Sequence, residues 1–274
     1  MNFSTRSSSP ESPFSSFSEW TLIVAVNHEE VLQGTLLKSP DIDDRCQLVL
    51  TRGYSTAGQA YNEGIAKAKN EILVFAHQDV YLPQGWLNCL GRSLAQLDDR
   101  DPNWGVLGVC GVANSSDLSG HVYSTGLHRT LGAPFDRPIE CLTLDEMLLI
   151  IRRSSGLMFD ERLPGFHLYG TDICLEARGR SLKSYVIPAF CIHNSNGIVR
   201  LPKTFWKAYL YLRRKWWKRL PISTPCATVT RWCGPMGWSV LRGTINALFL
   251  SNAVGKRTVD PERLCRDLLN ATDT

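Results

Sequence analysis

The sequence predicts an α/β fold in which helices flank a mostly parallel, Rossmann-like sheet. Three apolar runs, at residues 20–26, 46–51 and 72–76, have the continuous hydrophobicity of strands that are buried on both faces. A helix pattern with a face of small and apolar residues fills positions 57–70, between the second and third runs. A strand, a helix and a strand within about thirty residues form a βαβ unit, whose strands run parallel.

The remaining elements are predicted from the same kinds of pattern. Ser55 or Thr56 can act as the N-cap of the helix at 57–70. The further elements that we expect, in chain order, are a helix at 83–97, a Gly-laced strand at 104–112, a loop-rich segment at 113–136, a strand at 148–153, a helix at 172–179 and a last strand at 184–191.

The composition indicates a globular protein with a polar leader. Residues 1–18 are rich in Ser and Pro and lack the apolar core of a signal peptide, so we expect a disordered leader and a cytoplasmic chain. Residues 19–199 form the predicted sheet domain, which is followed by an extension at 200–274. The nine cysteines show no CxxC spacing, which argues against a zinc ribbon or a redox motif.

The extension at 200–274 is basic and aromatic, and we expect it to be helical. It holds 14 basic and 4 acidic residues, a net charge of +10, whereas residues 1–199 carry −6. Basic and aromatic residues interleave at 203–219, which suits the surface of an anionic membrane. The same pattern suits an acidic glycan, or a helix whose aromatic side chains pack on the core. A nucleic-acid partner is less favoured, and no apolar stretch has the length that spans a bilayer.

Polar clusters close three of the apolar runs, at residues 27–29, 77–79 and 193–196. Because the carboxyl ends of parallel strands meet at one edge of a sheet, we expect these clusters to converge. One carboxylate and one imidazole can hold Mg²⁺ or Mn²⁺ against the oxygens of a diphosphate, and the imidazole favours Mn²⁺. Such a cation would neutralise the charge that grows on a departing nucleotide diphosphate.

Each candidate residue also has a purely structural interpretation. Asp79 can cap the turn that follows its strand, and His193 can be a hydrogen-bonded histidine at a strand end. His167 has apolar neighbours and can pack on the core. Asp172 stands where a helix is expected to begin, a position at which the helix dipole stabilises a carboxylate.

Over residues 20–198 the chain resembles the family 2 glycosyltransferases and their relatives with the GT-A fold. The matching segments are VAVN at 24–27, AYNEGIAKAKNEILVFAHQDV at 60–80, FDERLPGFHLYGTDICLEA at 159–177 and CIHNSNG at 191–197. The resemblance implies that residues 19–199 form a catalytic domain. It also implies transfer of a sugar, with inversion, from a nucleotide-diphosphate donor to a hydroxyl of a glycan, lipid-linked or protein acceptor, as in polysaccharide biosynthesis.

The resemblance also implies roles for individual residues. The family's metal motif falls on residues 77–79, which implies Asp79 as the metal-binding carboxylate and His193 as a further ligand. Asp172 is the first candidate for the general base that deprotonates the acceptor, and His167 is the second. The residues expected to contact the donor are Ala25, Val26, Asn27, Tyr54, Ser55, Asn62, His77 and Gln78.

Two departures from the family pattern keep other functions open. His77 replaces the first carboxylate of the metal motif, and Gly170 falls where many relatives have part of an acidic pair. These changes suit a catalytically inactive module that binds a nucleotide sugar. A nucleotidyltransferase is less favoured, because residues 24–34 lack the Gly-rich and basic signature that would grip a triphosphate.

Overall fold

The computed structural model describes residues 19–113, 117–198, 200–234, 236–240, 242 and 255–272, so the leader expected at 1–18 lies outside the described part. The strands are β1 (Trp20–Val26), β2 (Cys46–Arg52), β3 (Ile72–Ala76), β4 (Val80–Tyr81), β5 (Val106–Gly108), β6 (Cys110–Ala113), β7 (Leu118–Ser124), β8 (Arg129–Gly132), β9 (Ile139–Leu144), β10 (Leu148–Arg152), β11 (Ser184–Val186), β12 (Cys191–His193), β13 (Ile222–Ser223) and β14 (Thr228–Val229). The helices are α1 (Glu29–Gly34), α2 (Ala57–Lys67), α3 (Trp86–Arg100), α4 (Tyr169–Gly179), α5 (Lys203–Lys215) and α7 (Pro261–Thr272), with short 3₁₀ turns at Leu36–Lys38, Arg153–Ser155 and Trp217–Arg219.

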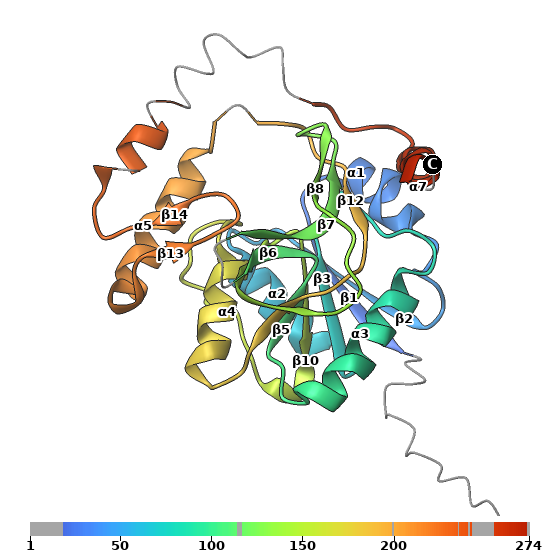
Figure 1. Ribbon diagram of the computed structural model, residues 1–274, viewed down its shortest axis with the longest axis horizontal. Helices are drawn as coiled ribbons and strands as arrows, with labels where there is room; N and C mark the ends of the chain where they lie inside the picture. Colours follow the sequence, from blue (N-terminus) through green and yellow to red (C-terminus); the bar gives the residue numbers. More distant parts are fainter. Residues whose placement is uncertain are drawn as a thin grey trace, which may run out of the picture.

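A twelve-stranded sheet forms the centre of the molecule, and helices cover both of its faces (Figure 1). The expected α/β class is therefore confirmed. Alternate residues of each central strand enter different cores. Ile23 and Phe75 pack with α2 and α4 on one face, whereas Leu22 and Val74 pack with α3 on the other. This two-sided burial explains why the strands appear in the sequence as continuous apolar runs.

The sheet is mixed, and its longest parallel part lies at one end. β1 pairs in parallel with both β2 and β3, so the two strands of the expected βαβ unit are parallel but are separated by β1. β10 then runs antiparallel to β3 and to β5. From β9 to β4 most neighbours are antiparallel. The parallel pairing that we expected is therefore continuous over β1, β2 and β3, and it recurs further along the sheet in the pairs β5–β11 and β7–β12.

Several element boundaries differ from the expected ones. The segment at 104–112 divides into β5 and β6, and the segment at 184–191 divides at Pro188 into β11 and β12. The segment at 113–136, expected to be loop-rich, contains the antiparallel pair β7 and β8, and β9 was not foreseen. Thr56 is the N-cap of α2, where its hydroxyl accepts a hydrogen bond from the Gln59 amide at 3.3 Å.

The first part of the extension packs on the sheet domain. Phe205, Ala208, Tyr209 and Leu212 of α5 are buried in the core that contains α2 and α4. Packing on the core therefore accounts for this face of the helix. The membrane interpretation of 203–219 stays a prediction for the exposed face. No helix within the described ranges is long and apolar enough to cross a bilayer.

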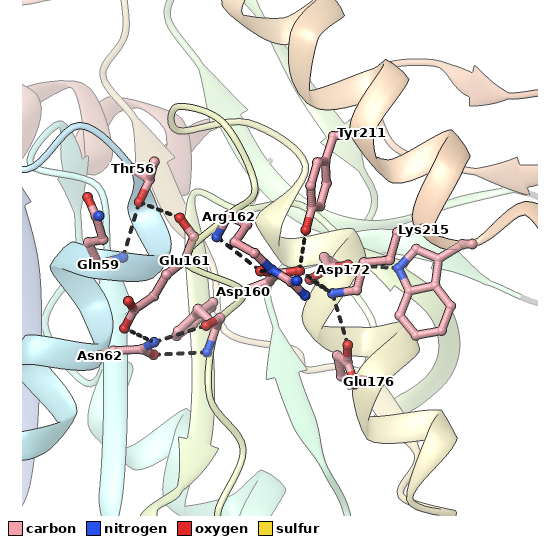
Figure 2. Close-up of polar contacts among 12 residues, drawn as sticks. Thr56, Gln59, Asn62, Asp160, Glu161, Arg162, Asp172, Glu176, Tyr211 and Lys215 are labelled. Atoms are coloured by element: carbon pink, nitrogen blue, oxygen red, sulfur yellow. Dashed lines mark hydrogen bonds and ion pairs between the residues drawn. The ribbon is translucent and has the colours of Figure 1, made fainter.

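A lysine at the end of α5 fixes this helix to the domain. The Lys215 ammonium lies 2.8 Å from carboxylate oxygens of both Asp160 and Asp172, and 2.9 Å from Glu176 (Figure 2). Burial disfavours the charged form of Lys215, but the three carboxylates outweigh burial and raise the pKa of the ammonium. Tyr211 donates a further hydrogen bond to Asp160 at 2.9 Å.

Replacing Lys215 should destabilise the protein strongly. Lys215→Met keeps the aliphatic stem but leaves Asp172, which is 2% exposed, as a buried carboxylate without its cation. Removing one partner of a buried ion pair costs about 3 kcal/mol or more, which urea unfolding would measure. The matched control is Lys218→Met at an exposed lysine, for which we expect a change below about 0.5 kcal/mol. Equal stability of the two variants would contradict this account.

Candidate functional site

A cavity of about 610 Å³ opens at the carboxyl ends of β1, β2 and β3. Parallel strands of open α/β sheets commonly place ligands at this edge. The lining residues are Ala25, Val26, Asn27, Thr51, Gly53, Tyr54, Ala60, Tyr61, His77, Gln78, Asp79 and Phe166. The cavity thus brings together six of the eight residues expected to contact the donor, and the carboxylate expected to bind the metal.

Gln78 joins the ends of β1 and β3 across this cavity. Its side-chain oxygen accepts hydrogen bonds from the backbone amides of Asn27 at 3.0 Å and His28 at 3.1 Å. Its amide nitrogen donates to the side-chain oxygen of Asn27. These bonds hold the polar residues that follow the two strands in one arrangement.

Asp79 and His193 meet because their strands pair. β4 and β12 are antiparallel, with His193 opposite Val80, and the Asn194 amide donates to the Asp79 carbonyl at 2.7 Å. The His193 Nε2 atom lies 3.5 Å from Asp79 Oδ1. One potential ligand atom from each of His77, Asp79 and His193 lies within 4.8 Å of the others. One carboxylate and two imidazoles suit a divalent transition metal such as Mn²⁺.

Hydrogen bonding identifies the available nitrogen of His77. The Tyr169 hydroxyl donates to the Glu146 carbonyl at 2.8 Å and lies 2.9 Å from His77 Nε2. Because the hydroxyl has a single proton, it accepts from His77, whose Nε2 therefore carries the ring proton. Burial lowers the pKa of His77, which favours this neutral ring. The lone pair of Nδ1 is then free to bind a metal, and Tyr169 orients the ring.

The charges around Asp79 keep it ionised. Burial opposes ionisation, but His193 and Arg257 outweigh burial and hold the pKa of this carboxyl well below its usual range. Burial lowers the pKa of His193, but the attraction of Asp79 is stronger and raises it overall. Arg257 belongs to the C-terminal segment, and its Nη2 atom lies 3.2 Å from Asp79 Oδ2. Asp79 is therefore an ionised carboxylate with the His193 imidazole on one side and the Arg257 guanidinium on the other.

The structure places Asp172, the first candidate for the general base, in the Lys215 cluster. Its Oδ2 atom lies 2.8 Å from Lys215 Nζ, and its Oδ1 atom accepts a hydrogen bond from the Trp216 indole at 2.7 Å (Figure 2). Asp172 is not among the residues that line the cavity. The sequence could not reveal this arrangement, because Lys215 and Trp216 come from a helix more than 40 residues further along the chain.

Two of the residues expected to contact the donor also lie off the cavity. The Asn62 side chain donates to the Phe159 carbonyl at 2.9 Å and accepts from the Phe159 amide at 2.9 Å, so that it holds this loop against α2 (Figure 2). Asn62 lines a separate depression of about 470 Å³. Ser55 is exposed and its hydroxyl donates to the Gln59 side chain at 3.3 Å.

Glu146 is a buried acid that the sequence interpretation missed. It follows β9, a strand that was not foreseen, so its place at a strand end was hidden. Its Oε1 atom accepts from the Leu168 amide at 3.1 Å and lies 3.9 Å from His167 Nδ1. Burial, reinforced by Asp145, raises the pKa of Glu146 to about 8. Burial also lowers the pKa of His167, so a neutral imidazole faces a largely protonated carboxyl.

Glu146 should make the stability of the protein depend on pH. Its folded pKa of about 8 lies above the ordinary 4.5, so its contribution to stability is present below pH 4.5 and is lost progressively as pH rises toward 8. In Glu146→Gln the side chain keeps an oxygen that can accept the hydrogen bond from the Leu168 amide, but the side chain cannot ionise. From pH 5 to pH 8 the wild type should lose stability relative to this variant, by about 1.4 kcal/mol per unit of pKa shift. If urea unfolding showed the same change in stability from pH 5 to pH 8 for the wild type and for Glu146→Gln, the raised pKa of Glu146 would be contradicted.

Comparisons with known proteins show that the chain has distant relatives. No protein-family model matches the chain. A curated protein from Fuscovulum blasticum, "ATP synthase subunits region ORF 6", is 29% identical over 143 residues, which cover 50% of this chain and 57% of that protein. The chain therefore spans little more than half the length of this curated relative.

The solved structures to which the chain is similar include a mannosyltransferase. This is PcManGT from Pyrobaculum calidifontis in complex with GDP-Man and Mn²⁺, at 12% identity and a TM-score of 0.45, with 92% of this chain and 80% of that chain covered. GalNAc-T7 with UDP, GalNAc and Mn²⁺ matches at 12% identity and a TM-score of 0.49, with 73% and 48% covered. S. aureus TarS matches at 14% identity and a TM-score of 0.41, with 72% and 65% covered. With TM-scores below 0.5, these matches describe at most a shared arrangement of strands and helices.

Proposed function

We propose that the protein is a glycosyltransferase that binds a nucleotide-diphosphate sugar in the cavity at the ends of β1, β2 and β3. The observation that carries this proposal is the convergence of His77, Asp79 and His193 beside that cavity. A bound Mn²⁺ or Mg²⁺ would supply positive charge to the diphosphate as it leaves the sugar. The ionised Asp79 and the Nδ1 atom of His77 are suitable ligands for such an ion.

The wall of the cavity suits a nucleoside. Tyr54 offers aromatic surface and is partly exposed, so its ring can stack on a base, whereas Tyr61 is a buried part of the cavity wall. Asn27, whose side chain is held by Gln78, offers polar groups at the end of β1. In this orientation the diphosphate reaches Asp79, and the sugar lies toward Phe166 and the loop that carries His167.

For the general base we propose His167, which was the second candidate. Its pKa is lowered by burial, so the imidazole is neutral and able to accept a proton. The side chain is 31% exposed, and although His167 is not itself among the residues that line the cavity, it follows Phe166, which is. Asp172 is the alternative base, but it would first have to exchange its bond to Lys215 for one to the acceptor. Either base is consistent with an inverting transfer.

The metal role predicts a specific loss of activity. We expect UDP- or GDP-sugars to stabilise the wild type in thermal-shift measurements only when Mn²⁺ is present, and to be hydrolysed slowly to the free nucleotide. Asp79→Asn should lower the hydrolysis rate on the order of 10²-fold or more, because it removes the carboxylate that holds the cation. The control is Asp136→Asn, at an exposed aspartate on the surface. Unchanged hydrolysis by Asp79→Asn would rule out the role, and binding that needs no metal would favour an inactive binding module.

The two candidate bases can be separated by kinetics. His167→Ala should lower kcat for nucleotide release by roughly 10²-fold or more while leaving the KM of the donor nearly unchanged, because a base acts in the transition state. Asp172→Asn can still accept from Trp216, and we expect a much smaller effect on kcat. The reverse pattern would assign the base to Asp172.

A further inference from the structure

The C-terminal segment reaches the candidate metal site as a strap of four residues, 255–258. At its start the Gly255 amide donates to the Gly126 carbonyl at 3.1 Å, and the Gly255 carbonyl accepts from the Gly197 amide at 2.8 Å. A Cβ atom at Gly255 would lie only 1.9 Å from the Thr125 carbonyl oxygen. Glycine is therefore the residue that lets the strap lie this close to the loops after β7 and β12.

A buried asparagine ties the strap to the backbone of Asp79. Asn194 is fully buried, and its side-chain oxygen accepts from the Thr258 amide at 2.8 Å. Its side-chain nitrogen donates to the Thr258 carbonyl at 2.9 Å, and its own amide donates to the Asp79 carbonyl at 2.7 Å. After the strap, α7 packs Cys265 against Tyr81 of β4. The strap is therefore built onto β4 and β12, the two strands whose pairing brings Asp79 and His193 together.

The strap directs one side chain, Arg257, at Asp79. The Arg257 amide donates to the Asn196 side chain at 3.0 Å, and its Nε atom donates to the Asn194 carbonyl at 2.7 Å. Its Nη2 atom donates to Asp79 Oδ2 at 3.2 Å. Two of the five N–H groups of the guanidinium make these side-chain bonds. The side chain is 28% exposed, so a ligand in solution can reach it.

A divalent cation and the Arg257 guanidinium would compete for the Asp79 carboxylate. A cation held by Asp79, His77 and His193 would lie beside the positive charge of Arg257, and the two would repel each other. The guanidinium would then turn from Asp79 toward the nearest anion. In a loaded donor site that anion is the diphosphate, whose oxygens a guanidinium binds through two parallel hydrogen bonds.

We propose that Arg257 exchanges partners, pairing with Asp79 when the site is empty and with the diphosphate of the donor when a cation and nucleotide are bound. This inference rests on the proposed function, since it concerns the same site. It assigns the strap two opposite effects: Arg257 weakens the binding of the cation alone, and it strengthens the binding of the nucleotide diphosphate once the cation is present.

The test measures Mn²⁺ and UDP or GDP binding by titration calorimetry, with free Mn²⁺ counted by electron paramagnetic resonance. Arg257→Met should bind Mn²⁺ alone about tenfold more tightly than wild type, and should bind the nucleotide at saturating Mn²⁺ about tenfold more weakly. Arg257→Lys keeps the charge but not the paired donors, so it should recover only part of the nucleotide affinity. Arg263→Met is the control, since Arg263 lies on the exposed face of α7 and pairs with Asp267.

The outcomes separate this inference from the proposed function. Opposite shifts in Arg257→Met, with Mn²⁺ binding lost again in the double variant Asp79→Asn/Arg257→Met, would support the exchange. An unchanged Mn²⁺ affinity, or an unchanged nucleotide affinity, in Arg257→Met would overturn it while leaving the proposed function intact. If wild type and Arg257→Met both fail to bind Mn²⁺, with or without nucleotide, the proposed metal site itself fails.

Discussion

The antiparallel pairing of β4 with β12 is the constraint on which the site depends. It places His193 opposite Val80 and so brings an imidazole to Asp79, and it positions Asn194 to anchor the C-terminal strap. A shift of one residue in this register would turn His193 to the other face of the sheet. The metal cluster, the strap and the mouth of the cavity therefore share one structural cause.

A second set of contacts positions the cluster of His77, Asp79 and His193 from behind, on the side away from the expected cation. Tyr169 orients His77 and donates a hydrogen bond to the Glu146 carbonyl. The turn after β9 and the start of α4 therefore position His77 at the end of β3. Packing of α5 on the same core, through Lys215, fixes α4 from the outer side. Substitutions in the basic extension should thus reach the site through α4, which gives that extension a structural role in addition to any contact with an acceptor or a lipid.

The sequence predicts β1, β2 and β3 well, because their residues are apolar on both faces, and polar residues directly after β1 and β3 line the cavity. It predicts β7 and β8 poorly, because most of their residues are exposed or partly exposed and their pattern resembles a loop. Pairing in space is the part that pattern alone cannot supply. Lys215 meets Asp172 from 43 positions away, and Arg257 meets Asp79 from 178 positions away.

The central claim is that Asp79, His77 and His193 hold a divalent cation against a nucleotide diphosphate. The most direct measurement is anomalous X-ray diffraction at the manganese edge, from crystals of the protein grown with Mn²⁺ and UDP or GDP. We expect one strong anomalous peak within coordination distance of the Asp79 carboxylate and the Nδ1 atom of His77, bridged to the diphosphate. A nucleotide bound elsewhere, or a bound diphosphate without a manganese peak at Asp79, would contradict the account.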